Sequence, residues 1–259
     1  MFGTITARSA VLLVLLPLVF GGPVSAFAQF QVSAIDPAEP AIQTSPAQPF
    51  GLDAAPVTSG ELLTKWNGVG AAIRAENEVL AGCRDAAQPC PAAAQKFLAV
   101  VADGRARTGR ARIGVINRAI NLAIEPVSDL AQWGVLDRWS APLATLTSGR
   151  GDCEDYAIAK YVALTAAGVS ADDVKLVIVR NLAAGEDHAV AAVRLDDKWI
   201  VLDNRRLTLL EDIEMPRVLP LFVLDHDGVK QFAPTAVADA PATTAPGEIT
   251  VAAPGSLAF

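Results

Sequence analysis

Histidine and cysteine are scarce in this sequence, which has two histidines and three cysteines among 259 residues. None of them has the spacing of a zinc site, so a zinc-dependent function is not indicated. The sequence also lacks a Gly-x-Ser-x-Gly segment, which leaves a serine nucleophile without support. Acidic residues outnumber basic ones, the net charge is −7, and no basic stripe is present to meet phosphates. This composition argues against a nucleic-acid partner.

Long apolar segments are missing as well. The strongest apolar run, Val11–Phe20, has about 10 residues, whereas a membrane-spanning helix needs roughly 20. Arg8 precedes this run, and Ala26–Ala28 has the small-x-small pattern of a cleavage site. Residues 1–28 are therefore predicted to be a signal peptide. The mature chain is expected to be exported and not to be an integral membrane protein.

Export decides how the three cysteines are interpreted, because disulfides persist in oxidising compartments. Cys83 and Cys90 are close in sequence, with prolines on both sides of Cys90, so we predict a disulfide that closes a small loop. Cys153 is then the odd thiol, which is either a buried inert residue or a reactive one. The charged residues next to Cys153 favour a reactive thiol.

The distribution of apolar residues divides the rest of the chain into three parts. Residues 29–57 are rich in Pro, Ala and Gln and are predicted to be a linker, and the Ala- and Pro-rich residues 233–259 a disordered tail. Residues 58–232 have the periodicity of one folded domain. Helices are predicted over 61–82, 92–102, 110–124 and 153–168, and strands over 174–179, 188–195, 199–203 and 221–224. Helices followed by an antiparallel meander give an α+β fold class, with the N-terminal helices packed on the sheet.

The segment Gly149–Ala157 places Cys153 at the start of a helix, directly after a glycine-rich turn. A helix start stabilises a thiolate through its free N–H groups and its dipole. A nucleophilic cysteine also needs a base that takes its proton and a third group that orients the base. His188 begins one predicted strand and Asp203 ends the next, and the tight turn between the two strands brings their far ends together. We therefore predict Cys153, His188 and Asp203 as catalytic residues.

Other residues compete for two of these roles. His226 is the second histidine, but it stands in a turn sequence followed by Gly228, where a solvated side chain is the simpler interpretation. Asp196 and Asp197 occupy the predicted hairpin turn. Asp187 adjoins His188 and would point to the opposite face of a strand. His188 and Asp203 are therefore preferred.

Three carboxylates flank the cysteine at Asp152, Glu154 and Asp155. Carboxylate oxygens are suitable ligands for calcium, although the spacing of an EF-hand is absent. Three carboxylates within four residues are more often a helix cap followed by a solvated face. Trp133 and Trp139, in the connection before the cysteine, are likewise open to two interpretations, as walls of a cleft or as caps of the core.

Several segments together carry a family resemblance. They are Val115–Asn121, Trp133–Gly134 with Asp137 and Trp139, Gly149–Lys160, His188, and Leu202–Asn204. This set resembles the bacterial transglutaminase-like cysteine peptidases, which include the LapG-type periplasmic proteases that release biofilm adhesins. The resemblance implies a papain-like, transglutaminase-type core with Cys153 as nucleophile, His188 as general base and acid, and Asp203 as the orienting carboxylate.

The resemblance also extends to a metal and to partners. In LapG-type members the acidic residues beside the cysteine bind calcium, which implies Asp152, Glu154 and Asp155 as ligands here. It further implies a periplasmic location, a protein substrate such as a cell-surface adhesin, and an inner-membrane cyclic di-GMP receptor as partner. The sequence is therefore expected to encode a periplasmic cysteine peptidase. Two alternatives are a transglutaminase-type acyl transferase and a non-catalytic, calcium-dependent binding module.

Overall fold

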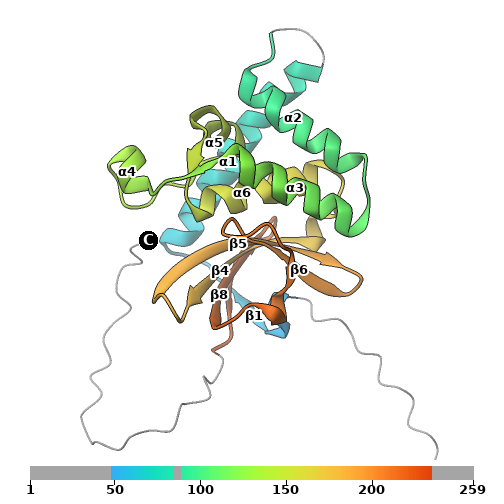
Figure 1. Ribbon diagram of the computed structural model, residues 1–259. Coiled ribbons are helices and arrows are strands. Elements are labelled where there is room, and N and C mark those ends of the chain that lie inside the picture. Colours follow the sequence, from blue (N-terminus) through green and yellow to red (C-terminus); the bar gives the residue numbers. More distant parts are fainter. Residues whose placement is uncertain (1–47, 85–88, 235–259) are drawn as a thin grey trace, which may run out of the picture. The chain divides into compact units, whose positions relative to one another are not determined.

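The computed structural model describes residues 48–84 and 89–234 (Figure 1). The helices are α1 (Glu61–Arg84), α2 (Ala92–Arg105), α3 (Gly109–Ala123), α4 (Asp129–Trp133), α5 (Pro142–Ser148) and α6 (Cys153–Ala166). The strands are β1 (Ala54–Pro56), β2 (Glu125–Pro126), β3 (Arg150–Gly151), β4 (Val174–Asn181), β5 (Glu186–Leu195), β6 (Lys198–Leu202), β7 (Leu210–Glu211), β8 (Val218–Asp225) and β9 (Gly228–Phe232). Short 3-10 helices cover Pro49–Gly51, Ala171–Asp173 and Asp212–Glu214. The predicted signal peptide, most of the predicted linker and nearly all of the predicted tail lie outside the described residues.

One antiparallel sheet holds the strands in the order β1-β9-β8-β4-β5-β6-β7, and β2 pairs separately with β3 in parallel. The hairpin of β5 and β6 forms as predicted, with Leu195 opposite Lys198 and Ala191 opposite Leu202. The α+β prediction, with N-terminal helices packed on an antiparallel sheet, is confirmed. Helices and sheet form two layers, with the helices on one face of the sheet (Figure 1).

Helix α6 is the central element of the helical layer. It packs against β4 and β5 on one side and against α2, α3 and α5 on the other. Its residues from Glu154 to Leu164 are all buried, including Lys160 with none of its surface exposed. A helix that is apolar around most of its circumference belongs in the interior, which is the prediction made for this segment. The strands supply the matching apolar side chains through their alternation, for example Ala189 and Ala191 of β5.

The second face of the sheet has a smaller core of its own. Val190 and Ala192 of β5 lie there with Phe232, and Phe50 and Leu52 pack against them. The predicted linker of residues 29–57 is therefore wrong for its last part. Strand β1 extends the sheet by pairing with β9, because an edge strand and an uncovered apolar face both need a partner. Strand β1 has only three residues, one of them a proline, so its sequence shows no alternation from which a strand could be predicted.

The connection between α3 and α6 is more structured than its sequence suggests. Ser128 caps α4 by accepting from the N–H of Ala131, and Gly134 ends that helix in the left-handed region. Helix α5 begins at Pro142, and the carboxylate of Glu76 from α1 accepts from two N–H groups of its first turn. The turn after α5 leads directly through β3 to Cys153.

The predicted disulfide between Cys83 and Cys90 is present and joins the end of α1 to the segment before α2. Cys153 is the free cysteine. Among the described residues, no helix combines the length and the apolar character that crossing a membrane requires.

Candidate active site

Cys153 is the first residue of α6, and Gly149, with φ 67°, provides the left-handed turn that precedes it. The thiol donates to Glu154 Oε2 at 3.0 Å, and the backbone N–H of Ala189 on β5 approaches its sulfur. Burial and then the neighbouring carboxylate of Glu154 raise the pKa of the Cys153 thiol. The helix start alone therefore does not give a thiolate here, which differs from the expectation based on helix position.

His188 and Asp203 meet at the open end of the β5–β6 hairpin, as the turn position predicted. Nε2 of His188 lies 2.9 Å from Oδ1 of Asp203, and both side chains are buried. An ionised carboxylate only accepts hydrogen bonds, so Nε2 carries the proton and Nδ1 presents a lone pair. Within the described residues, Nδ1 is buried and has no hydrogen-bond partner. This leaves the imidazole with one oriented edge and one free basic edge.

Asp203 is held by several donors. Besides His188, the backbone N–H of Arg205 donates to Oδ1 at 2.9 Å, and Arg206 Nε lies 3.1 Å from Oδ2. Burial by itself would raise the pKa of Asp203, but the hydrogen bond and charge of His188 and the donors from Arg205 and Arg206 lower it to about 2. The carboxylate therefore stays ionised at neutral pH.

Cys153 and His188 do not form a hydrogen bond with each other within the described residues. His188 has the same strand parity as Val190, whose side chain lies on the sheet face away from α6. Cys153 lines a cavity of about 630 Å³ and His188 lines a second one of about 180 Å³. Among the described residues the structure therefore does not bring the thiol and the imidazole together. Catalytic hydrogen bonds in free enzymes often form only in the substrate complex.

An acidic group lies beside Cys153. Oxygens of Asp129, Asp152 and Asp155 all lie within 4.8 Å of one another. Burial and the mutual repulsion of carboxylates raise the pKa of Asp152 to about 9, and burial raises that of Asp155 to about 7. Within the described part of the chain, Oδ1 of Asp129 and Oδ1 of Asp152 are buried without a donor. Such a set of hard, unsatisfied oxygens fits a divalent cation such as calcium.

This group differs from the ligand set that the sequence indicated. Asp152 and Asp155 belong to it. Glu154 contacts the thiol through Oε2 and also interacts with Asp152, and its Oε1 is buried without a partner among the described residues. Asp129, at the start of α4, joins the group although sequence reasoning did not select it. In the sequence, Asp129 is marked only by its position after the capping Ser128. The chain between α4 and α6 brings Asp129 close to Asp152 and Asp155, and this is visible only in the folded structure. Asp152 stands at the N-cap position of α6, yet its side chain makes no capping hydrogen bond.

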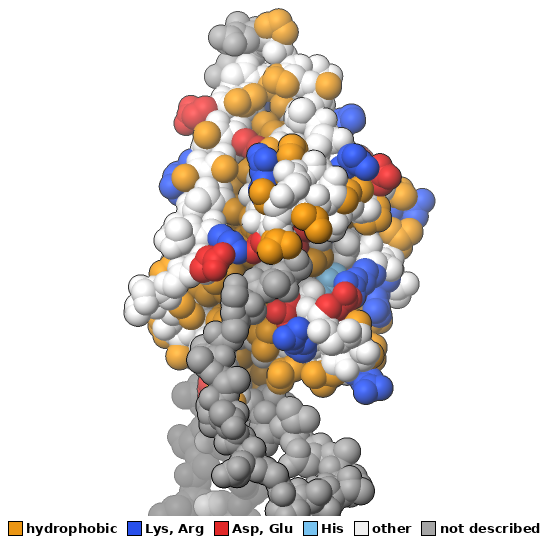
Figure 2. Space-filling model, turned by 90° about the vertical axis from the view of Figure 1, so that its left-hand side faces the viewer, with side chains coloured by type: hydrophobic (Ala, Val, Ile, Leu, Met, Phe, Trp, Pro, Cys, Tyr) orange, Lys and Arg blue, Asp and Glu red, His pale blue; other side chains and the backbone are white. Residues whose placement is uncertain are grey.

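The larger cavity adjoins the cysteine and the acidic group. It is lined partly by the exposed apolar side chains Leu130 and Leu136, which are 59% and 63% exposed, and partly by charged residues of β4 and β5. Figure 2 shows acidic, basic and hydrophobic side chains interspersed on the face that it presents. Neither Trp133 nor Trp139 lines this cavity. Trp139 packs against the main core, whereas Arg138 covers the half-exposed Trp133.

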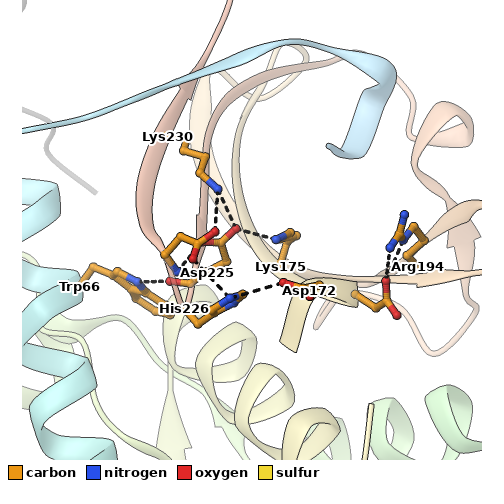
Figure 3. A network of polar contacts seen from close by, with 9 residues as sticks. Trp66, Asp172, Lys175, Arg194, Asp225, His226 and Lys230 are labelled. Carbon is orange, nitrogen blue, oxygen red and sulfur yellow. Dashed lines mark hydrogen bonds and ion pairs between the residues drawn. The ribbon is translucent and has the colours of Figure 1, made fainter. Parts of the chain in front are cut away.

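The rival residues have other partners. Asp187 pairs with Arg180, with Nε and Oδ1 3.1 Å apart. Asp196 and Asp197 form the hairpin turn, both with positive φ. His226 is 42% exposed and lies near Asp172, in the polar network around Asp225 that Figure 3 shows.

Comparisons with known proteins show which family this chain belongs to and which structures share its fold. The family described as bacterial transglutaminase-like cysteine proteinase matches residues 78–214, more than half of the chain. LapG of Legionella pneumophila is similar in structure, with 19% identity and a TM-score of 0.50 over 60% of this chain and 86% of that one. Its calcium-bound form gives 20% identity and a TM-score of 0.51 over 61% and 92%. No curated protein matches the chain.

The matched range contains Cys153, His188 and Asp203, together with the three aspartates of the acidic group. The structural similarity at this level of identity supports the fold, and the match to the family covers the site. This chain therefore belongs to the bacterial transglutaminase-like cysteine proteinases.

Proposed function

We propose that this peptidase acts in the periplasm and cleaves a protein substrate with a triad of Cys153, His188 and Asp203. One observation carries the assignment of the triad. The His188 ring is oriented by Asp203 through Nε2, while the buried Nδ1 is left without a partner within the described residues. An imidazole that is oriented on one side and has an unpaired ring nitrogen on the other is the arrangement that a general base needs.

In the proposed reaction the thiol proton of Cys153 passes to Nδ1 of His188. The resulting thiolate attacks the carbonyl carbon of the scissile peptide bond. His188 then gives the proton to the leaving amine, and a thioester forms on Cys153. Water, deprotonated by the same ring, hydrolyses the thioester and restores the thiol. Asp203 remains ionised throughout and holds the imidazole in the required tautomer.

The oxyanion of the tetrahedral intermediate needs donors that are already in place. The N–H of Cys153 lies in the first turn of α6, where backbone donors have no partner inside the helix. A second donor is not assigned: Nε1 of Trp139 is buried without a partner among the described residues, but Trp139 does not line the cavity of Cys153.

Calcium is proposed as the ion of the acidic group, with Asp129, Asp152 and Asp155 as its ligands. A bound calcium ion would supply positive charge that offsets the crowded carboxylates beside Cys153. The comparison with the calcium-bound form of Legionella LapG supports the choice of metal.

The N-terminal sequence pattern supports export. The family resemblance extends the proposal to a cell-surface adhesin as substrate and to an inner-membrane cyclic di-GMP receptor as partner.

Alkylation with iodoacetamide tests the triad directly, because Cys83 and Cys90 are paired and Cys153 is the free thiol. We expect the mature protein in calcium buffer to be alkylated at Cys153 at pH 7, and the His188→Ala variant to lose most of this reactivity. Slow labelling that does not depend on His188 would overturn the triad. Transfer of a fluorescent amine to a glutamine-containing protein, without peptide cleavage, would instead identify an acyl transferase.

Calcium binding is tested by the melting temperature of protein pretreated with a chelator. Added calcium should raise it, and the shift should disappear in Asp129→Asn and in Asp152→Asn. The Glu154→Gln variant should keep most of the shift, because Glu154 is not among the three carboxylates whose oxygens all lie within 4.8 Å of one another. A shift lost only in Glu154→Gln would contradict the ligand set.

A further inference from the structure

The loop that follows β6 contains Asp203, and the sheet does not hold it. Beyond Leu202 the chain leaves the ladder, and residues 203–209 belong to no helix or strand. A triad carboxylate on an unsupported loop could not keep the imidazole of His188 in a fixed orientation. The carbonyl groups of this loop therefore need donors from elsewhere.

Those donors come from two helices. Lys160 of α6 donates from Nζ to the carbonyl of Leu202 at 3.2 Å. Asn121 of α3 donates from Nδ2 to the carbonyl of Asp203 at 3.0 Å and to that of Arg206 at 3.1 Å. The two side chains thus bind the residue before the triad aspartate, the aspartate itself and the end of the turn after it.

In both helices a buried polar atom lacks a full set of hydrogen-bond or charge partners, which destabilises the folded state relative to an apolar side chain at that position. Lys160 is fully buried, its ammonium is 5.7 Å from the ring centre of Tyr156, and no carboxylate lies within ion-pair distance of it in the described chain. Burial lowers the pKa of Lys160 to about 7, while the charge of Asp203 opposes that effect. Oδ1 of Asn121 is buried and has no donor among the described residues, so this amide uses only its N–H groups. Polar groups kept at such a cost point to a positional role.

Asn117 extends the same face of α3. It lies one helical turn before Asn121, is fully buried, and its Nδ2 is 3.4 Å from the carbonyl of Leu207. The segment Val115–Asn121 that marks the family resemblance therefore contributes two amides to one loop. The two amides reach the candidate site by donating to backbone carbonyls of this loop, and they do not line the larger cavity.

We propose that Asn121 and Lys160 are positioning residues, which fix Asp203 by binding the carbonyls of residues 202, 203 and 206 and thereby hold His188 in its catalytic orientation. This inference rests on the proposed triad. It assigns to α3 and α6 a role in the reaction that is separate from filling the core.

The test combines Asn121→Ala and Lys160→Met with Asp203→Ala in double-mutant cycles. We expect each single variant to lower the rate of Cys153 alkylation about tenfold, as the loss of supporting contacts around a site often does. If Asn121 and Lys160 act through Asp203, neither substitution should lower the rate further once Asp203 is alanine. Additive effects in that background would overturn the proposal.

A second readout follows the His188 ring itself. The protein has only two histidines, so imidazole ¹⁵N spectra contain two rings that are easily distinguished. The Nε2 proton bonded to Asp203 should exchange with water at least tenfold faster in Asn121→Ala and in the isosteric Asn121→Asp, which cannot donate. An unchanged exchange rate in folded protein would reduce Asn121 to a purely structural residue.

Two control variants separate position from stability. Arg118→Ala changes an exposed residue of α3, and Lys175→Met removes a buried lysine in the distant network of Figure 3. Lys175→Met should lower the melting temperature yet leave alkylation and the His188 spectrum of the folded protein unchanged. If the alkylation rate is insensitive to His188 and Asp203 themselves, the proposed triad fails. If it depends on them but not on Asn121 and Lys160, only this inference fails.

Discussion

Asp203 and Asp152 are both withdrawn from solvent at the same active site, but they have opposite surroundings. Asp203 accepts from His188 and from the backbone of Arg205, and Arg206 neutralises its second oxygen. Asp152 has an oxygen without a donor among the described residues, and its neighbours are further carboxylates. Accordingly the pKa falls to about 2 for Asp203 and, through burial first and repulsion second, rises to about 9 for Asp152.

The difference indicates which side of the site is complete. The side with Asp203 has its donors in the protein and is ready to orient an imidazole. The side with Asp152 is crowded with negative charge, and there burial, followed by the carboxylate of Glu154, raises the pKa of the Cys153 thiol. A cation is the simplest partner that would complete it. The following predictions test whether the number of hydrogen-bond and charge donors, and not burial, decides if a buried carboxylate has a lowered or a raised pKa.

The largest effect is expected from Lys175→Met. Asp225 is a third buried carboxylate, held by Lys175 at 2.5 Å and Lys230 at 3.3 Å (Figure 3). Removing Lys175 leaves Asp225 with too few donors, so the free energy of unfolding in urea should fall by about 3 kcal/mol. Lys198→Met, which breaks an exposed pair with Glu211, should leave the free energy of unfolding almost unchanged. If the free energy of unfolding falls equally in Lys175→Met and Lys198→Met, a buried carboxylate does not depend on its donors in the way we infer.

Gly151→Ala should have the next largest effect, on the acidic side. A Cβ at this position would lie 2.7 Å from Oδ2 and 2.8 Å from Cβ of Asp155, so Asp155 must move. We expect a loss of about 1–3 kcal/mol in unfolding free energy, together with a weakened calcium-induced rise in melting temperature. Gly114→Ala is the control, because its nearest neighbour would be 3.8 Å away. A full calcium response in Gly151→Ala would show that Asp155 is not a ligand.

The pH dependence of stability tests Lys160. Its pKa is lowered by burial from 10.5 to about 7, so between these values the unfolded chain binds a proton that the folded protein does not. The contribution of Lys160 to the free energy of unfolding should therefore rise with pH in this window, by up to about 1.4 kcal/mol per pH unit. Denaturant titrations from pH 7 to pH 10 should show a smaller slope in Lys160→Met. Parallel curves would mean that Lys160 stays charged in the folded protein.

The smallest effect is expected from Glu76→Gln. Burial raises the pKa of Glu76, as it does for Asp152, but the N–H groups of Leu143 and Ala144 donate to it. An amide keeps one acceptor, so we expect a loss of about 1 kcal/mol in thermal or chemical unfolding. Calcium should raise the melting temperature of this variant as much as that of the unchanged protein. A diminished rise would indicate that α5 also shapes the acidic group.

Much of the active site could be predicted because its signals are local in sequence. A glycine turn before an apolar helix positions Cys153, and a two-residue turn fixes which ends of β5 and β6 meet, so His188 and Asp203 follow from register. Asp129 and Asn121 could not be predicted in this way. Each reaches the site from another element, and neither has neighbours that distinguish it from an ordinary cap or helix residue.

The fold shows the same division. Periodicity gave α6 and the hairpin, because burial of one helix or one strand face leaves a repeating pattern. It did not give β1, whose pairing with β9 depends on an apolar face that residues distant in sequence create. The sequence by itself determined the α+β class and predicted Cys153 as the nucleophile and His188 as its base. Only the tertiary structure decided how many donors surround each carboxylate, because those donors come from several separate segments, and that number sets the charge of each side of the site.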